Sequence, residues 1–400
     1  MRIERTYDRI VREHLGKYRQ MVFLSGPRQV GKTTVARGVA EAYFDWDNVD
    51  SREILLKGPG AVAEKAGLTK LSAGLRVVAF DEIHKFGKWK DFLKGFFDTY
   101  EADVRVVVTG SGRLDAFNRG GDSLMGRYFP YRVHPLGVAE LLGGDLPREG
   151  RLTREPSSLP EEDWAALWTH GGFPEPYARR DAAFTRRWRS LRVQQLLRKD
   201  VADLRAVREL GQMEVLARIL ARRTGEQLVA AGLANEVRTS ENTVREWVGV
   251  FEALHYGFTV RPYAVNVENS LRKTPKWYLR DWSGVADAGK RAETFVACHL
   301  LKAVEGWTDL GLGEFGLFYL RDKKKREVDF LVTRDGTPWF LAEVKKGEES
   351  LSPNLAYFQK ATGAAHAFQV VVDADYVEAD CFARGGPVVV PARTFLSQLM

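Results

Sequence analysis

The sequence predicts an α/β protein in which a parallel sheet is followed by a helical region and then by a second α/β part. Strand-like runs at residues 21–24, 76–80 and 104–108 alternate with helical segments, which is typical of a parallel sheet. A Gly- and Pro-rich stretch interrupts the chain after residue 142, and helical patterns follow it. Two strand-like runs separated by a short turn then lie near residue 335.

The composition is that of a globular chain. Its 400 residues, 44% of them hydrophobic, are enough for roughly two to four domains with their own cores. No apolar run is long enough to cross a membrane and the amino terminus is charged, so we expect a cytoplasmic protein without a membrane partner. Cys298 and Cys381 are too far apart for a zinc motif or a disulfide framework. The net charge of +7 is compatible with a DNA partner but does not require one.

The run GPRQVGKT at residues 26–33 lies between a predicted buried strand and a predicted helix at residues 34–43. It matches the P-loop pattern G-x-x-x-x-G-K-[ST], in which backbone N–H groups and a helix N-terminus bind phosphates. Lys32 is expected to contact the outer phosphates, and the Thr33 hydroxyl to ligate Mg²⁺. The predicted nucleotide-binding residues are Gly26, Pro27, Arg28, Gln29, Val30, Gly31, Lys32, Thr33, Thr34 and Thr109.

Acidic and polar residues end the next two strands of the predicted sheet. Asp81 and Glu82 have the pattern of a Walker B element, in which Asp81 holds Mg²⁺ and Glu82 orients or deprotonates the attacking water. Thr109 and Ser111 follow the third strand, where either side chain could contact that water or the terminal phosphate. Ordinary turn residues would give the same pattern at these two positions.

Together these motifs resemble those of the prokaryotic AAA-type ATPases that carry a carboxyl-terminal domain of unknown function. The resemblance also includes Trp89, the run SLMGRY at residues 123–128 and the run GGFPE at residues 171–175. It implies ATP rather than GTP as the nucleotide, and it makes Arg127 a candidate for stabilising charge in the transition state. It further implies similarity to AAA proteins that act as homo-oligomers.

The central part of the chain begins after a linker at residues 143–162 and is predicted to be helical over residues 163–224. Residues 179–208 are strongly basic, which fits either a phosphate-binding face or the solvated face of a bundle helix. The basic residues of this stretch include Arg186, Arg187, Arg189, Arg192, Arg198 and Lys199.

Residues 225–281 have the pattern of a winged helix, with helices at 228–237 and 241–254 and strands near 258–263 and 276–279. Ser240 is the expected N-cap of the second helix. That helix carries Glu241, Glu246 and Glu252, which would repel phosphates, so packing or partner binding is an equally open role. Basic residues that could still contact a DNA backbone are Arg261, Arg272, Lys273 and Lys276.

A hairpin near residue 335 supplies the second chemical pattern. If its loop is residues 335–337, Asp329 lies opposite Glu343, and period-two alternation places Lys345 on the same face. Two carboxylates and a lysine can hold Mg²⁺ or Mn²⁺ and activate water for phosphodiester hydrolysis. The pattern resembles the PD-(D/E)xK nuclease signature, although Val328 stands where that signature has proline. A surface hairpin with alternating charge is the competing interpretation.

Two further residues extend the resemblance to nuclease-like folds. Glu293 lies on the apolar stripe of a predicted helix, where a buried acid needs a metal or Lys345 as partner. Gln359 follows on a later helix and matches a glutamine that such nucleases often carry. The predicted catalytic residues are Lys32, Glu82, Arg127, Asp329, Glu343 and Lys345, and the predicted metal ligands are Thr33, Asp81, Glu293, Asp329 and Glu343.

The sequence therefore predicts five parts: an AAA-type ATPase domain (1–142), a linker (143–162), a helical region (163–224), a winged-helix-like domain (225–281) and a nuclease-like domain (282–400). The predicted function is an ATPase associated with DNA and coupled to a metal-dependent nuclease-like domain. The alternative is a nucleotide-switched regulatory or scaffold protein whose carboxyl-terminal domain binds DNA or protein without cleavage. An ATP-driven protein remodeller is a third possibility.

Overall fold

The computed structural model describes residues 3–70, 74–110, 124–197, 210–264, 274–348 and 350–400. The predicted roles of Ser111, Arg198, Lys199, Arg272 and Lys273 fall outside these ranges. The chain divides into two compact units, Met1–His134 and Pro135–Met400.

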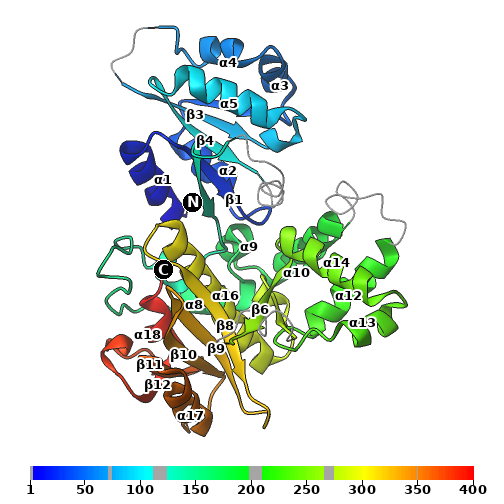
Figure 1. The fold of residues 1–400 in the computed structure, drawn as a ribbon, viewed down its shortest axis with the longest axis vertical. Coiled ribbons are helices and arrows are strands. Elements are labelled where there is room, and N and C mark those ends of the chain that lie inside the picture. Colours follow the sequence, from blue (N-terminus) through cyan, green and yellow to red (C-terminus); the bar gives the residue numbers. More distant parts are fainter. Residues whose placement is uncertain (1–2, 71–73, 111–123, 198–209, 265–273, 349) are drawn as a thin grey trace. The chain divides into compact units, whose positions relative to one another are not determined.

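The first unit is a parallel five-stranded sheet of order β2-β3-β4-β1-β5 with helices on both faces (Figure 1). Its strands are β1 (Met21–Ser25), β2 (Ala42–Asp45), β3 (Arg76–Asp81), β4 (Val104–Thr109) and β5 (Tyr128–Arg132). Its helices are α1 (Thr6–Lys17), α2 (Lys32–Val39), α3 (Val49–Leu56), α4 (Pro59–Lys65) and α5 (Trp89–Tyr100), with a 3₁₀ turn η1 (Ile83–Lys85). The predicted helix at residues 34–43 is therefore wrong at its end, because Ala42–Asp45 pairs with β3 as a strand.

Strand alternation explains how this sheet buries both faces. Met21 and Phe23 of β1 belong to one large core with side chains of α3, α4 and α5. Val22 and Leu24 point to the other face and are also fully buried, on the side that α1 and α2 cover. The central strands β1, β3 and β4 are mostly hydrophobic for this reason. The carboxyl ends of the parallel strands meet at one edge of the sheet.

The second unit contains a mixed seven-stranded sheet of order β12-β11-β10-β9-β8-β6-β7. Its strands are β6 (Gly257–Pro262), β7 (Lys276–Leu279), β8 (Phe315–Arg321), β9 (Glu327–Arg334), β10 (Thr337–Lys345), β11 (His366–Val371) and β12 (Pro387–Pro391). Its first helices are α7 (Val138–Leu141), α8 (Glu161–His170), α9 (Pro174–Arg179), α10 (Ala182–Gln195), α12 (Leu210–Arg222), α13 (Ala230–Val237) and α14 (Glu241–Ala253). The remaining helical elements are η4 (Trp282–Gly284), α16 (Ala288–Asp309), α17 (Pro353–Thr362), η5 (Cys381–Ala383) and α18 (Ala392–Ser397).

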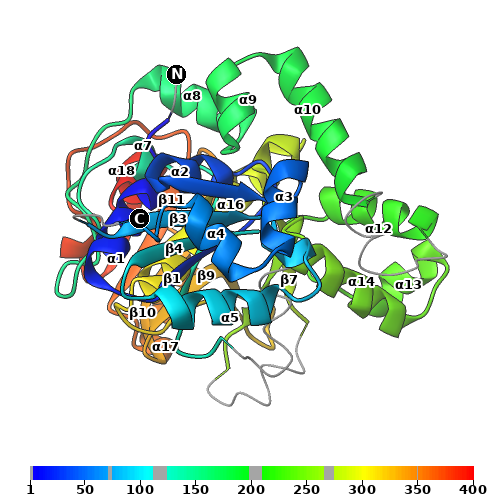
Figure 2. The same ribbon diagram turned by 90° about the horizontal axis from the view of Figure 1, so that it is seen from above.

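The two helices and two strands predicted for residues 225–281 are present, and the Ser240 side chain caps α14 by accepting the N–H of Thr243 at 3.1 Å. Helices α12, α13 and α14 form one core with β7, and Figure 2 shows α10 leading from α9 toward this group. The strands do not form an isolated wing, however. Strand β6 pairs with β7 on one side and with β8 on the other, so the sheet continues across the boundary predicted at residue 281.

The predicted hairpin has the expected strand register, but its loop is one residue shorter than predicted. Its loop is the two residues Asp335 and Gly336, both with positive φ, which is the usual two-residue hairpin turn. An irregularity between Pro338 and Phe340 then adds one residue to β10, so that Ala342 lies opposite Phe330. Continued by one residue, this register places Glu343 of β10 opposite Asp329 of β9. The expected three-residue loop is wrong.

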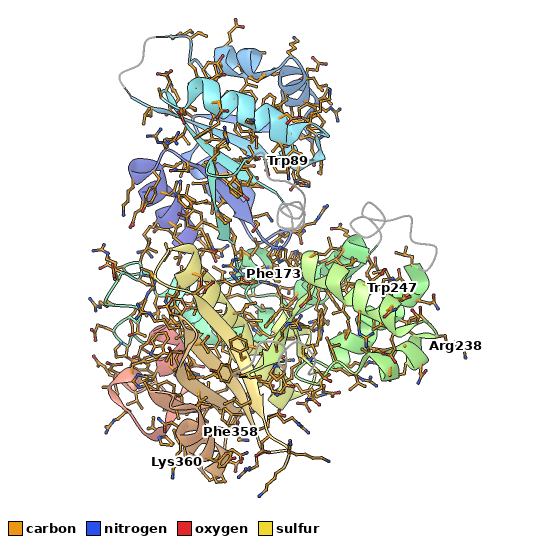
Figure 3. The ribbon with its side chains drawn as sticks, in the orientation of Figure 1. Trp89, Phe173, Arg238, Trp247, Phe358 and Lys360 are labelled. Carbon is orange, nitrogen blue, oxygen red and sulfur yellow. The ribbon has the colours of Figure 1, made fainter. Side chains whose placement is uncertain are left out.

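Helix α16 packs on the sheet through β8, β9 and β10, whereas α17 packs on β9, β10 and β11. Because both faces are covered, Val328, Phe330, Val332, Ala342 and Val344 are buried as predicted, and Leu331 and Leu341 are buried too. Trp89 lies in the core of the first unit, Trp247 in the core of α12–α14, and Phe358 in a further core that includes Leu331 and Leu341. Arg238 and Lys360 are exposed (Figure 3).

Side chains of helix α16 also bond to residues near the start of the second unit. His299 Nδ1 bonds to the carbonyl of Phe295 at 2.8 Å, and its Nε2 accepts the N–H of Val138 at 3.1 Å. Lys302 forms a buried ion pair with Glu140. No helix within the described ranges is both long and apolar enough to cross a membrane.

Candidate functional site

The P-loop joins β1 to α2 through backbone conformations that favour glycine. Gly26 has φ +143°, and a Cβ atom there would lie 2.3 Å from the Val133 carbonyl oxygen. Gly31 has φ +104° and is the N-cap of α2. Both positions therefore exclude larger residues, and the amino end of α2 opens toward the loop, as phosphate binding requires.

Lys32 lies inside this loop. Its ammonium donates hydrogen bonds to the carbonyl oxygens of Gly26 at 2.8 Å and Pro27 at 2.7 Å. Val30 and Pro27 are buried, Arg28 is half-buried, and Gln29 and Thr34 are exposed. The loop carbonyls thus hold the lysine over the place where the motif binds phosphates.

Asp81 is the residue on which the predicted nucleotide site converges. It ends β3 and accepts hydrogen bonds from the Thr33 hydroxyl at 2.8 Å and from the hydroxyls of Thr109 and Tyr43. Strand β4, which carries Thr109, lies between β1 and β3, so the sheet order brings these groups together. A threonine hydroxyl beside a carboxylate is a suitable pair of oxygen ligands for Mg²⁺.

Two residues of this site carry no signal in the sequence motifs. Tyr43 reaches Asp81 from β2, and burial followed by the neighbouring carboxylate raises the pKa of its hydroxyl. Arg5 is 3% exposed and supports the P-loop from α1: it donates to the Val30 carbonyl and, at 2.6 Å, to the His134 carbonyl. An arginine buried against carbonyls 25 and 129 positions later in the chain cannot be recognised from local spacing.

Glu82 directly follows β3 in the left-handed backbone region, with φ +54°. Its carboxylate lies 3.1 Å from the Lys85 ammonium and 3.8 Å from His84 Nε2. A nonglycine residue held in this conformation stores strain, a feature that is enriched at functional sites.

Arg127 lies at the opposite edge of the sheet. Its carbonyl accepts the N–H of Met21, the first residue of β1, whereas the P-loop follows the last residue of that strand. Its guanidinium forms a two-point ion pair with Asp98 at 2.7 and 2.9 Å. Five strand residues separate the two edges by about 16 Å, so Arg127 does not belong to the group of residues around Asp81.

The predicted nuclease-like residues form a buried cluster of a different kind. Glu293, Glu327 and Asp329 surround the ammonium of Lys276 at 3.1, 2.7 and 3.4 Å. The Lys276 side chain is 5% exposed, so the expectation that it contacts DNA is wrong. Each acid has a second donor: Tyr278 for Glu293 at 2.6 Å, Arg321 for Glu327 at 2.5 Å, and the Val344 N–H for Asp329 at 2.9 Å.

The charges of this cluster are strongly coupled. Burial and the Asp329 charge raise the pKa of Glu293 to about 7, and the same two causes raise the pKa of Glu343 to about 7. Burial alone would lower the pKa of Lys276, but the three carboxylates outweigh it and raise that pKa. The ammonium therefore stays charged and neutralises its neighbours.

The donors of this cluster do not fit the predicted metal site. Lys276 occupies the space between Glu293 and Asp329 that a cation would need. Of the acids in this cluster, only Glu343 has a buried carboxylate oxygen, Oε2, without a hydrogen-bond partner within the described residues. In the same part of the chain, no group of three or more His, Cys, Asp or Glu side chains is placed to hold a metal ion. The predicted metal centre of Glu293, Asp329 and Glu343 is therefore corrected to an acidic cluster with an internal lysine.

The two other predicted residues near this cluster have ordinary partners. Lys345 Nζ lies 3.2 Å from Glu343 Oε1 and is half-buried, as the strand alternation predicts. Gln359 instead donates to the carbonyls of Ala364 and Gly385 at 3.2 and 2.5 Å. It therefore stabilises loops and does not join the acids.

Comparison with known proteins divides the chain in a similar way. Residues 18–142 match the sequence model of an AAA domain (AAA_14). Residues 161–290 and 288–393 match two domains of unknown function, DUF8612 and DUF4143.

Relatives along most of the chain are uncharacterized proteins. Rv2008c of Mycobacterium tuberculosis is 25% identical over 357 residues, which cover 84% of this chain and 72% of that protein. MJ1637 of Methanocaldococcus jannaschii is 23% identical over 310 residues, covering 68% of this chain and 63% of that protein. The Orc1 protein of Aeropyrum pernix, solved in complex with DNA, aligns with 73% of this chain and 91% of its own at 13% identity, with a TM-score of 0.31.

The match to the AAA domain covers the P-loop, Asp81 and Thr109. The parallel sheet with helices on both faces is the fold that this motif requires. The amino-terminal part of the chain is therefore an AAA-type ATPase domain.

Proposed function

We propose that this chain binds and hydrolyses ATP at the P-loop and uses the nucleotide state to control a carboxyl-terminal part that binds a partner without cutting it. The contact between the Thr33 hydroxyl and Asp81 at 2.8 Å is the observation that carries the first half of the proposal. It joins the two motifs that must act on one nucleotide.

In this proposal each residue around Asp81 has a distinct task. Lys32 exchanges its bonds to the Gly26 and Pro27 carbonyls for phosphate oxygens, and the N–H groups at the amino end of α2 add further donors. Thr33 and Asp81 hold Mg²⁺, which neutralises phosphate charge when it is bound. Glu82 orients the attacking water and accepts its proton, and Thr109 keeps the Asp81 carboxylate in place.

The test of ATP hydrolysis is Lys32→Ala, which should abolish turnover while the circular dichroism spectrum and unfolding midpoint remain those of a folded chain. Lys57→Ala is the matched control, because Lys57 is exposed and lies outside the loop. Unchanged turnover in Lys32→Ala would remove the proposed site.

In this proposal, Arg127 acts on the nucleotide bound to a neighbouring copy of the chain. Its position at the amino edge of the sheet separates it from the Lys32 of its own chain, and this separation supports action between copies of a homo-oligomer. The ion pair with Asp98 then represents the state of the arginine when no neighbouring copy engages it.

For the carboxyl-terminal part, the lysine within the acidic cluster favours binding without cleavage. We take DNA as the partner, because the chain carries a net charge of +7 and α10 presents two exposed arginines, Arg186 and Arg187. Incubation of the intact protein with plasmid and Mg²⁺ or Mn²⁺ should leave the plasmid uncut, while gel-shift measurements at low salt should show binding. Cleavage that disappears in both Asp329→Ala and Lys345→Ala would establish the nuclease instead.

A further inference from the structure

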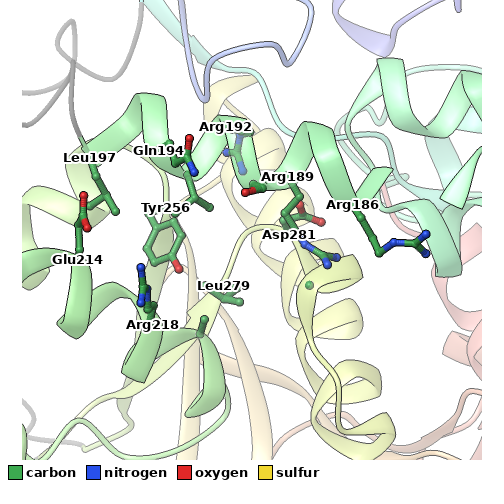
Figure 4. A pocket seen from close by; sticks show the side chains of 14 residues that line it. Arg186, Arg189, Arg192, Gln194, Leu197, Glu214, Arg218, Tyr256, Leu279 and Asp281 are labelled. Atoms are coloured by element: carbon green, nitrogen blue, oxygen red, sulfur yellow. The ribbon is translucent and has the colours of Figure 1, made fainter. Parts of the chain in front are cut away.

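A cavity of about 380 Å³ lies between α10, α12 and the segment around Asp281. Figure 4 shows side chains of α10 along one side, Arg218 of α12 on the other and Tyr256 between them. The cavity lies entirely within the second unit and within residues 161–290, the region matching a domain of unknown function. Its size is within the usual range of small-molecule sites.

The lining of this cavity is rich in guanidinium groups. Among the described residues, four arginines and two acids contribute to it, a net charge of two positive units. The arginines are Arg186, Arg189, Arg192 and Arg218, and the acids are Glu214 and Asp281. Arg189 donates to the Ser283 carbonyl at 2.7 Å. The other three arginines make no hydrogen bond or ion pair with residues that the structure describes.

Arg192 is the central observation. It is 7% exposed, and its guanidinium packs over the rings of Phe173 at 3.9 Å and Trp188 at 5.6 Å. Asp281 acts on it only at a distance, and burial lowers the pKa of the guanidinium despite that carboxylate. A buried cation without a bonded anion is costly, so the fold maintains a positive group that faces the cavity and has no hydrogen-bonded anion among the described residues.

Apart from Ser190 and Gln194, the other described lining residues are apolar or have a polar group with a bonded partner. Val193, Leu197 and Leu279 line the cavity, and the Tyr256 hydroxyl is held by the Ala217 carbonyl at 3.0 Å. Such a site suits a ligand with a compact anionic group and an apolar or aromatic body. Guanidinium groups recognise phosphate oxygens in pairs, and a phosphate monoester carries close to two negative charges at neutral pH.

We propose that this cavity binds a phosphate monoester of a small molecule with an aromatic or apolar body, with Arg192 contacting the phosphate and Arg218 facing the ligand from the opposite side. This is a second anion site, separate from the P-loop. The same phosphate chemistry is present at the end of a nucleic acid, and the experiment below separates the two sources.

The experiment is isothermal titration of the full chain with phenyl phosphate in the presence of saturating MgADP, which fills the P-loop. We expect one phenyl phosphate per chain, with affinity reduced about tenfold or more in Arg192→Met because a charged hydrogen bond is lost. Arg218→Met should weaken binding in the same direction and provides a second variant at an exposed position. Arg187→Met is the matched control, since Arg187 is exposed on the same helix and does not line the cavity.

Two results would overturn the proposal. The first is binding that is absent, or equally strong in wild type, Arg192→Met and Arg218→Met. The second is displacement of phenyl phosphate by a single-stranded oligonucleotide without a terminal phosphate, with Arg187→Met weakening that displacement as much as Arg192→Met does. That second result would assign the arginines to a nucleic-acid surface. Unchanged ATP turnover in Lys32→Ala would remove the proposed ATPase site but has no bearing on either outcome, so the two proposals can fail separately.

Discussion

Replacing Lys276 with methionine removes the ammonium of the acidic cluster while nearly preserving the length of the side chain. In the wild type this ammonium contacts three carboxylates, and its side chain is 5% exposed. Removing one partner of a buried ion pair costs about 3–5 kcal/mol. Each carboxylate retains another donor after the substitution, so we expect the lower end, about 3 kcal/mol of unfolding free energy.

The measurement is urea unfolding followed by tryptophan fluorescence, because Trp277 is fully buried beside Lys276. Lys346→Met is the matched control. Lys346 pairs with Asp373 at 2.6 Å, but the two side chains are 45% and 49% exposed, so the control should lose less than about 1 kcal/mol. A loss in Lys276→Met no larger than that of the control would contradict the stabilising role of the ammonium.

Adding Mn²⁺ tests whether the Lys276 ammonium takes the place of a metal ion among the acids. Without Lys276, the acids can gather around Mn²⁺, and the ion should raise the unfolding midpoint of the variant by selective binding to the folded state. The wild type should show no such rise. If Mn²⁺ stabilises the wild type and the variant equally, and Glu343→Gln abolishes both effects, the cluster is a metal site and our interpretation is wrong.

Three further predictions concern other parts of the chain. Arg5→Met removes charged hydrogen bonds to the Val30 and His134 carbonyls and should therefore weaken ATP binding about tenfold. Binding is measured with a fluorescent nucleotide, and the substitution Arg12→Met at an exposed position should leave it unchanged. Burial lowers the pKa of His299 from 6.5 to about 4, so stability present above pH 6.5 is lost as the pH falls toward 4. Between pH 8 and pH 5 the contribution of His299 to the free energy of unfolding should decrease by about 2 kcal/mol. Glu293 and Glu343, whose pKa values are raised to about 7, change stability in the opposite direction over this range, so the test is the difference between wild type and His299→Gln in urea titrations. Equal mixtures of Lys32→Ala and Arg127→Ala should regain ATP turnover that neither variant has alone; full turnover of Arg127→Ala by itself would exclude a role for this arginine.

Much of the first unit could be predicted because its signals are local. The P-loop glycines, the run before Asp81 and the strand before Thr109 each carry their information within a few residues. The end of α2 could not be placed in this way, because Ala42–Asp45 becomes a strand only through pairing with β3. The local pattern accordingly predicts a helix at Tyr43, which gives no sign of its contact with Asp81.

In the second unit, spacing predicted which carboxylates approach one another but not what lies between them. Glu293, Asp329 and Glu343 were identified from alternation and helical periodicity. Lys276 comes from β7, which reaches the cluster because β6 joins β7 to β8 within one sheet. A pairing between distant strands leaves no periodic trace in the sequence, so this lysine appeared to be an ordinary basic residue of a wing.

The pairing of β6 with both neighbours also limits how this polypeptide can be shortened. A fragment ending at residue 281 would expose the hydrogen-bonding edge of β6 that β8 normally covers, and open edges of this kind invite aggregation. A fragment beginning at residue 282 would keep the carboxylates of α16 and β9 but discard the ammonium that neutralises them. Neither half is therefore suited to separate expression, and truncation studies should retain Pro135–Met400 intact.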